Sequence, residues 1–161
     1  MYNDLLRIKA FREQNAAAAV TRQKRVVEEC VQSVQHARDE VVRFRAYRIQ
    51  QEQQRFDDIK GRPVPLQAIE NMKLHAAGLK DKESRLESQI LVEEKRLKEA
   101  QQALEQARQH HADAVREHEK FSEFMAIQRE AEQREQALRE ENELEEVAGA
   151  GRQVQSMVSL T

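Results

Sequence analysis

The sequence is poor in the residues that build disulfide frameworks, phosphate-binding loops and wide apolar cores. It has one cysteine, four glycines, two prolines and only 4% aromatic residues in 161 positions. A single cysteine cannot form a disulfide within the chain, and so few glycines exclude a glycine-rich phosphate loop. No apolar run approaches the roughly 20 residues that a transmembrane helix needs. We therefore expect no enzyme, no cofactor, no metal site and no insertion into a membrane.

Charged residues are abundant at 35%, and the chain is rich in Ala, Glu, Lys, Leu, Arg and Gln, which is typical of long helices and coiled coils. The formal net charge is only −2, but it is unevenly divided. Residues 1–65 carry 13 basic and 9 acidic side chains, whereas residues 119–147 carry 10 acidic and 4 basic ones. Such asymmetry bears on the choice of partners rather than on the fold. No basic region followed by an apolar stretch opens the sequence, so we expect a cytoplasmic protein.

One heptad repeat runs from Ile69 to Met125, and thirteen of its seventeen a and d positions are apolar. A spacing of 3.5 residues keeps one seam facing one neighbouring helix, so this stretch is expected to lie along a partner helix. The a positions are Ile69, Ala76, Glu83, Ile90, Leu97, Leu104, His111, His118 and Met125, and the d positions are Met72, Leu79, Leu86, Glu93, Ala100, Ala107, Ala114 and Phe121.

A second heptad pattern precedes it, and we place the first helix at residues 3–60. Its clearest a positions are Val20, Val27, Val34 and Val41, and its d positions are Gln23, Cys30, Ala37 and Phe44. Cys30 is interpreted as a small buried apolar residue. After Phe44 the pattern indicates a slip of one residue, with the apolar stripe continuing through Ile49, Glu52, Phe56 and Ile59.

Glycine and two prolines interrupt the helical pattern between residues 61 and 65. Gly61 suits the left-handed position after a helix end, and Pro65 suits the first position of a helix. A loop this short, at residues 61–64, predicts an all-α fold: an antiparallel two-helix coiled-coil hairpin with a longer second helix. We place that helix at residues 65–147, extending beyond its partner after about 121, and expect a flexible tail at 148–161.

Two patterns invite a chemical interpretation. His110, His111 and His118 lack the i,i+3 or i,i+4 spacing of helical metal pairs, so they are interpreted as polar residues at or beside the seam. The arginines between 38 and 55 alternate with acidic residues, which disfavours a surface that tracks nucleic-acid phosphates. We expect no nucleic-acid partner.

Aromatic, leucine and arginine side chains gather near the predicted loop, several of them away from the seam. Such residues are frequent anchors of protein interfaces. They form a candidate partner-binding group at this end of the hairpin: Phe44, Tyr47, Arg48, Phe56, Leu66 and Leu74.

The segment YRIQQEQQRFD, from Tyr47 to Asp57, resembles the YscO family of bacterial type III secretion proteins. In that family an aromatic-Arg pair is followed by Glu and Gln and by an aromatic residue before the hairpin loop. The order of parts is also similar: a basic start, a first helix, a short loop, a longer second helix and an acidic C-terminal end. The resemblance covers nearly the whole chain.

The resemblance implies a central stalk, like the flagellar protein FliJ. Such a protein engages the pore of the hexameric secretion ATPase and links it to the export gate in the inner membrane, and members also bind substrate chaperones. By this analogy the group near the loop meets the gate or chaperones. The ATPase ring would contact Leu5, Ile8, Phe11, Phe124, Arg129 and Leu138. The resemblance implies a cytoplasmic monomer, peripherally associated with the inner-membrane apparatus.

Two other classes of function remain open from the residues alone. One is a structural or chaperone-like adaptor that forms a homodimer along the heptad seam. The other is a coiled coil associated with nucleic acid, against which the acidic balance argues.

Overall fold

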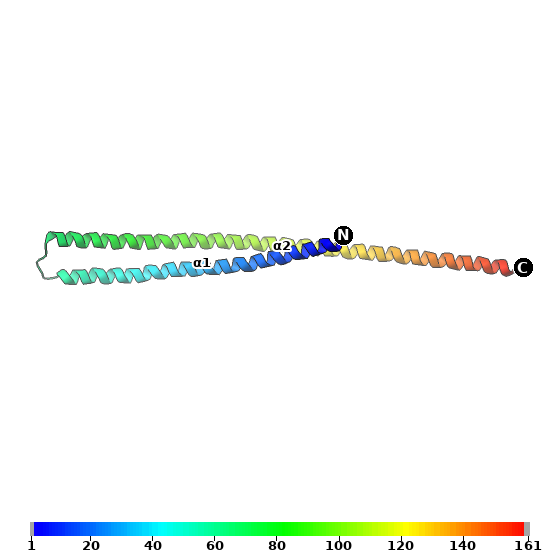
Figure 1. Ribbon diagram of the computed structural model, residues 1–161, viewed down its shortest axis with the longest axis horizontal. Helices are drawn as coiled ribbons and strands as arrows, with labels where there is room; N and C mark the ends of the chain where they lie inside the picture. The colour runs from blue at the N-terminus through cyan, green and yellow to red at the C-terminus, as the bar shows by residue number, and fades with distance from the viewer. Residues whose placement is uncertain (1, 160–161) are drawn as a thin grey trace. The chain divides into compact units, whose positions relative to one another are not determined.

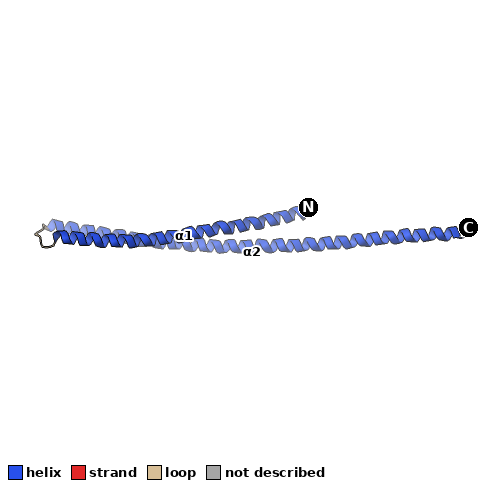
Figure 2. Cartoon of the chain, turned by 90° about the horizontal axis from the view of Figure 1, so that it is seen from below, coloured by secondary structure: helices blue, strands red, loops and turns tan. Residues whose placement is uncertain are grey.

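The computed structural model describes residues 2–159, and two helices contain nearly all of them. Helix α1 spans Tyr2–Ile59 and helix α2 spans Leu66–Ser159, and the described residues contain no strand (Figures 1 and 2). The protein is thus an all-α helical hairpin with a longer second helix, which confirms the predicted fold class.

The turn between the helices depends on the backbone of Gly61, whose φ is 73°. Nothing lies within 4 Å of the place where a Cβ would stand, so glycine is favoured there by its freedom to adopt positive φ. The N–H groups of Lys60 and Arg62 donate to the carbonyls of Phe56 and Ile59 at 3.0 and 3.3 Å. The carbonyl of Pro65 accepts the N–H of Ala68 at 3.0 Å, so α2 begins one residue later than predicted.

The chain divides into two compact units. The loop unit comprises residues 16–111 and contains the turn. The terminal unit comprises, among the described residues, 2–15 and 112–159. Each unit draws on both helices, so each has its own stretch of seam.

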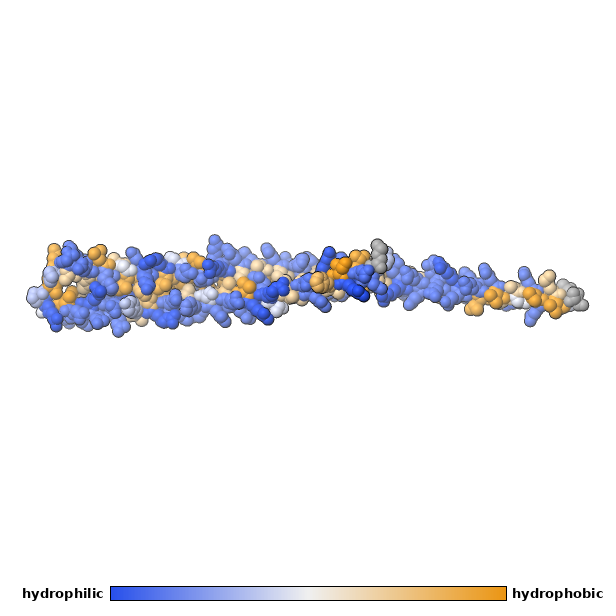
Figure 3. Space-filling model, in the orientation of Figure 1, coloured by the Kyte–Doolittle hydropathy of each residue, from blue (hydrophilic) through white to orange (hydrophobic). Residues whose placement is uncertain are grey.

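The core of the loop unit is a narrow apolar seam between antiparallel helices. In Figure 3 this seam shows as apolar atoms between polar flanks. No residue with a large, completely enclosed side chain is found in the described chain, because two helices alone leave both sides of the seam open to water. The buried residues of this unit are Ala16, Val34, Ala37, Val41, Phe44, Leu79, Ala100 and Leu104.

The predicted heptad of α2 agrees with the structure at every position. All seventeen a and d residues from Ile69 to Met125 are buried or half-buried. In α1 the predicted positions from Val20 to Phe44 are also buried or half-buried, Cys30 among them. The same register extends back to Leu6, where the sequence left it unclear.

The predicted slip directly after Phe44 does not occur. The original register continues as far as Arg55, so Arg48, Gln51 and Arg55 are half-buried at seam positions. Two residues of the predicted stripe, Glu52 and Ile59, are half-buried as well, whereas Asp58 at the next d position is exposed. Ile49 and Phe56, which the slip would have placed inside, are 59% and 52% exposed. A charged seam position is tolerated because Nε of Arg48 lies 2.7 Å from Oε2 of Glu83, and the apolar stem of the arginine can still pack.

Polar contacts across the seam of the loop unit fix the alignment of its helices. The amide of Gln23 donates to the carbonyl oxygen of Ala100 at 3.1 Å. Arg38 pairs with Glu94 at 3.0 Å nearer the turn. Because these contacts join particular residues, they select one register among those that a repeating apolar seam allows.

The terminal unit is held by a mixture of apolar and charged contacts. Met125 is its buried apolar residue among those described. Lys9 pairs with Glu117 at 3.2 Å, and Nδ1 of His118 lies 2.6 Å from Oε2 of Glu13. His118 is therefore a polar residue of the seam, as predicted.

Helix α2 continues beyond the predicted end at residue 147 as far as Ser159. The expected flexible tail is therefore helical over 148–159, and its last two residues, 160 and 161, lie outside the described chain. Alanine, arginine, glutamine and methionine are good helix formers, and they offset the roughly 1 kcal/mol that each of Gly149 and Gly151 costs. Every described residue from Ala126 onward is exposed, so the part of α2 that extends beyond α1 begins slightly later than predicted.

Candidate partner-binding surfaces

Four of the six residues predicted near the turn are exposed and lie away from the seam. Their exposed fractions run from 47% for Tyr47 to 72% for Leu66. The heptad register explains this exposure, because polar residues occupy the nearby seam positions and the apolar residues beside them face water. We call this set the loop-end surface: Tyr47, Phe56, Leu66 and Leu74.

Phe44 and Arg48, the other two predicted contacts, face the interior. Phe44 is 8% exposed, and its ring lies 5.9 Å from that of Tyr47, with the ammonium of Lys82 5.2 Å from the Phe44 ring centre. The Arg48 side chain pairs with both Glu83 and Glu52. Phe44 and Arg48 pack under the loop-end surface, and we expect no direct contact between either of them and a partner.

A cluster of charges lies where the seam turns polar. Glu83 occupies an a position and accepts a hydrogen bond from Nε of Arg45 at 2.8 Å, while Nη2 of Arg45 reaches Glu87 at 2.6 Å. The hydrogen bond from Arg45 is the main cause that lowers the pKa of Glu83, with the charge of Arg48 adding to it. The same contacts, that with Glu87 first, raise the pKa of Arg45. The carboxylate of Glu83 therefore stays ionised at the seam.

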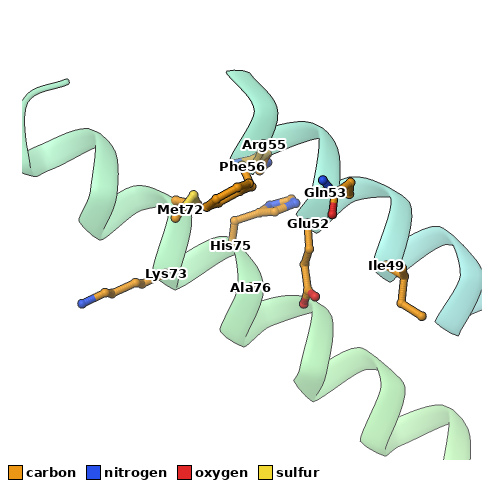
Figure 4. Close-up of a pocket in the computed structure, with 9 residues that line it drawn as sticks. All are labelled: Ile49, Glu52, Gln53, Arg55, Phe56, Met72, Lys73, His75 and Ala76. Atoms are coloured by element: carbon orange, nitrogen blue, oxygen red, sulfur yellow. The ribbon is translucent and has the colours of Figure 1, made fainter. Parts of the chain in front are cut away.

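An apolar groove of about 380 Å³ opens beside this cluster, between the last turns of α1 and the first turns of α2 (Figure 4). In Figure 4 Met72 lies against Phe56, and His75 points from α2 toward α1. Nε2 of His75 is buried without a hydrogen-bond partner. The lining residues are Ile49, Glu52, Gln53, Arg55, Phe56, Met72, Lys73, His75 and Ala76.

The sequence indicated Phe56 but missed the rest of the groove. The predicted slip places Ile49 at the seam, and the heptad pattern explains Met72 as a d residue. The available signal was Arg48: an arginine at an a position, with Glu83 at an a position of the other helix, can hold the original register by a charge pair. That pairing would have left Ile49 and Phe56 outside.

The predicted contacts of the terminal unit are also exposed apolar residues, with one arginine. The rings of Tyr2 and Phe124 meet edge to face at 6.1 Å, and Phe121 lies 6.2 Å from Phe124. Arg129 is exposed on the part of α2 that extends beyond α1. We call the exposed apolar set the terminal surface: Tyr2, Leu5, Ile8, Phe11, Phe124, Ile127 and Leu138.

The part of α2 that extends beyond α1 is stabilised by ion pairs between its own side chains. Glu130 pairs with Arg134 at 2.8 Å, and Glu135 pairs with Arg139 at 3.3 Å, as the i,i+4 spacing indicated. Each such exposed pair contributes a few tenths of a kcal/mol. Apolar side chains return near the end of this helix (Figure 3).

Two other kinds of site are absent from the described residues. Residues 2–159 contain no group of three or more His, Cys, Asp or Glu side chains placed to hold a metal ion. Neither helix, over its described length, has a stretch apolar enough to cross a bilayer.

Comparison with known proteins gives two matches of the same kind. A family model described as type III secretion protein YscO matches residues 2–150. The crystal structure of type III secretion protein YscO from Vibrio parahaemolyticus is similar over 91% of this chain and 92% of that one, with 29% identity and a TM-score of 0.84. No similar sequence was found among curated proteins.

Proposed function

Because the chain belongs to the YscO family of type III secretion proteins, we propose that it is a non-enzymatic coupling protein of the secretion apparatus. In this role the terminal surface, with Arg129, engages the pore of the hexameric secretion ATPase. The loop-end surface contacts the inner-membrane export gate, and substrate chaperones are further candidates for the same surface. The protein acts at the cytoplasmic side of the inner membrane as a monomer, without inserting into the bilayer.

The observation that carries this proposal is the displacement of bulky apolar residues from the seam in both units. Burying a side chain such as Ile49 or Phe56 would contribute about 1.5–3 kcal/mol. Instead, half-buried Arg48 and Arg55 occupy the seam, and the apolar residues face water. A helix pair selected only for stability would have the opposite arrangement, so the exposed residues are better explained as contacts for partners.

A coupling role also suits the number of helices. A hairpin of two helices has no six-fold symmetry, so it cannot contact six ring subunits in the same way. It can therefore favour different states in different subunits, since binding shifts an equilibrium only by its difference in affinity between states. The acidic part of α2, from residue 119 to 147, is suited by its charge to a basic surface on a partner.

Secretion by cells that carry single substitutions tests the loop-end contact. We expect Phe56→Ala and Leu74→Ala to reduce secretion strongly, while the helix content of the purified chain stays unchanged. Leu91→Ala is the matched control, because Leu91 is 67% exposed, close to the 71% of Leu74, but lies outside the surface. Full secretion by a folded double variant, Phe56→Ala with Leu74→Ala, would remove the loop-end contact from the proposal.

A further inference from the structure

The groove beside the turn contains nitrogen atoms that the chain itself leaves without partners. Arg55 is half-buried at a seam position, yet the described residues provide it with no ion pair and no hydrogen bond. Arg48, two turns earlier on the same seam, has the carboxylates of Glu52 and Glu83. Arg55 therefore differs from Arg48 in having no carboxylate of a described residue paired with it.

His75 adds a second such group in the same groove. Its Nε2 is buried and has no hydrogen-bond partner, and the side chain points toward α1 in Figure 4. A buried imidazole nitrogen without a partner is uncommon in native structures and requires an explanation. Lys73, also a lining residue, extends outward and has no ion pair in the described chain.

Glu52, the acidic residue of the groove lining, is already paired with an arginine of the same helix. Glu52 is held by Nη1 of Arg48 at 3.2 Å, so it does not compensate Arg55. The remaining charge of the lining is therefore positive, from Arg55 and Lys73. Beside these cations lie the apolar side chains of Ile49, Phe56 and Met72, in a volume at the small end of the range of about 300–1,000 Å³ typical of binding pockets.

We propose that this groove binds a segment of a partner protein in which an Asp or Glu stands beside a bulky apolar residue. The apolar side chain packs on Ile49, Phe56 and Met72, and the carboxylate pairs with Arg55. An anionic lipid headgroup would satisfy the cations but not fill the apolar floor, and a basic segment would meet Arg55 with like charge. The inference rests on the proposed function only in taking the loop end as a partner-binding surface.

Selection of random peptides displayed on phage against the immobilised full-length chain tests the chemistry directly. We expect the enriched peptides to carry Asp or Glu next to Leu, Ile, Met or an aromatic residue. Arg55→Glu should weaken the binding of these peptides by about tenfold or more, and selection on that variant should enrich Lys or Arg instead. Arg55→Gln should weaken binding without the reversal.

Arg25→Glu is the control for the change of charge alone, because Arg25 is an exposed arginine of the same unit outside the groove. Circular dichroism of each variant establishes that it is folded. Enriched peptides without acidic residues, no enrichment, or equal losses in Arg55→Glu and Arg25→Glu would each overturn the inference. If selection enriches acidic peptides while cells with Phe56→Ala and Leu74→Ala secrete normally, the groove does bind acidic segments, but the proposed contact of the loop-end surface with the export gate or a chaperone is wrong. If secretion depends on these residues but selection shows no acidic preference, the inference alone fails.

Discussion

Leu79→Ala tests whether the narrow seam of the loop unit carries the stability of that unit. Leu79 is 8% exposed at a d position of α2. Alanine lacks three of its carbon atoms, and burial is worth about 0.8 kcal/mol per carbon, so the transfer loss is about 2.4 kcal/mol. A seam open to water on both sides leaves no closed cavity to add to this loss, so the total cost stays at about 2.4 kcal/mol, near the lower end of the range for such substitutions.

Urea unfolding followed by far-UV circular dichroism measures this cost. With a slope of about 2 kcal/mol per molar, the midpoint of the loop-unit transition should fall by about 1 M. Leu91→Ala is the control, since the same atoms are removed from a side chain that is 67% exposed. Its midpoint should stay within about 0.3 M of the original. Equal shifts in the two variants would refute the seam as the source of stability.

Three further predictions concern single features. The pKa of Glu83 in the folded state lies below its ordinary value of 4.5, so the ionised carboxylate contributes fully to stability above pH 4.5 and loses this contribution as the pH falls through the folded-state pKa. The urea midpoint of the wild type should therefore approach that of Glu83→Gln only below pH 4.5. Gly61→Ala should lower the free energy of unfolding of the loop unit by about 1 kcal/mol and Gly61→Asn by less, since a φ of 73° disfavours residues with a Cβ. Equal unfolding midpoints for the wild type and these two variants would contradict this expectation. His118→Ala removes the contact with Glu13, so hydrogen exchange should accelerate up to about fivefold in the paired segments of the terminal unit while amides of the loop unit keep their rates.

The general architecture could be predicted because it depends on local signals. The heptad spacing determines which face of α2 is buried, and all seventeen predicted positions are buried or half-buried. Helix α1 ends before Gly61 because glycine can adopt a positive φ, and this property depends on a single residue. Such features require no knowledge of the opposite helix.

The groove could not be predicted because it depends on pairs of residues on different helices. Whether Arg48 or Ile49 faces α2 is decided by the contact of Arg48 with Glu83, and hydropathy alone favours Ile49. The same register leaves Arg55 half-buried at a seam position, with no ion pair to a described residue. The predicted end of α2 is wrong for a simpler reason: Gly149 and Gly151 indicate a helix end, but the helix formers around them outweigh the cost of the two glycines.

Photo-crosslinking in secreting cells tests the coupling role most directly. A photoreactive amino acid is placed at Phe11 in the terminal surface, at Leu74 in the loop-end surface, and at Leu91 as an exposed control. The account predicts that position 11 crosslinks to the secretion ATPase, position 74 to the export gate or a chaperone, and position 91 to neither. Crosslinks from 11 and 74 to the same protein, or to a second copy of this chain, would contradict it.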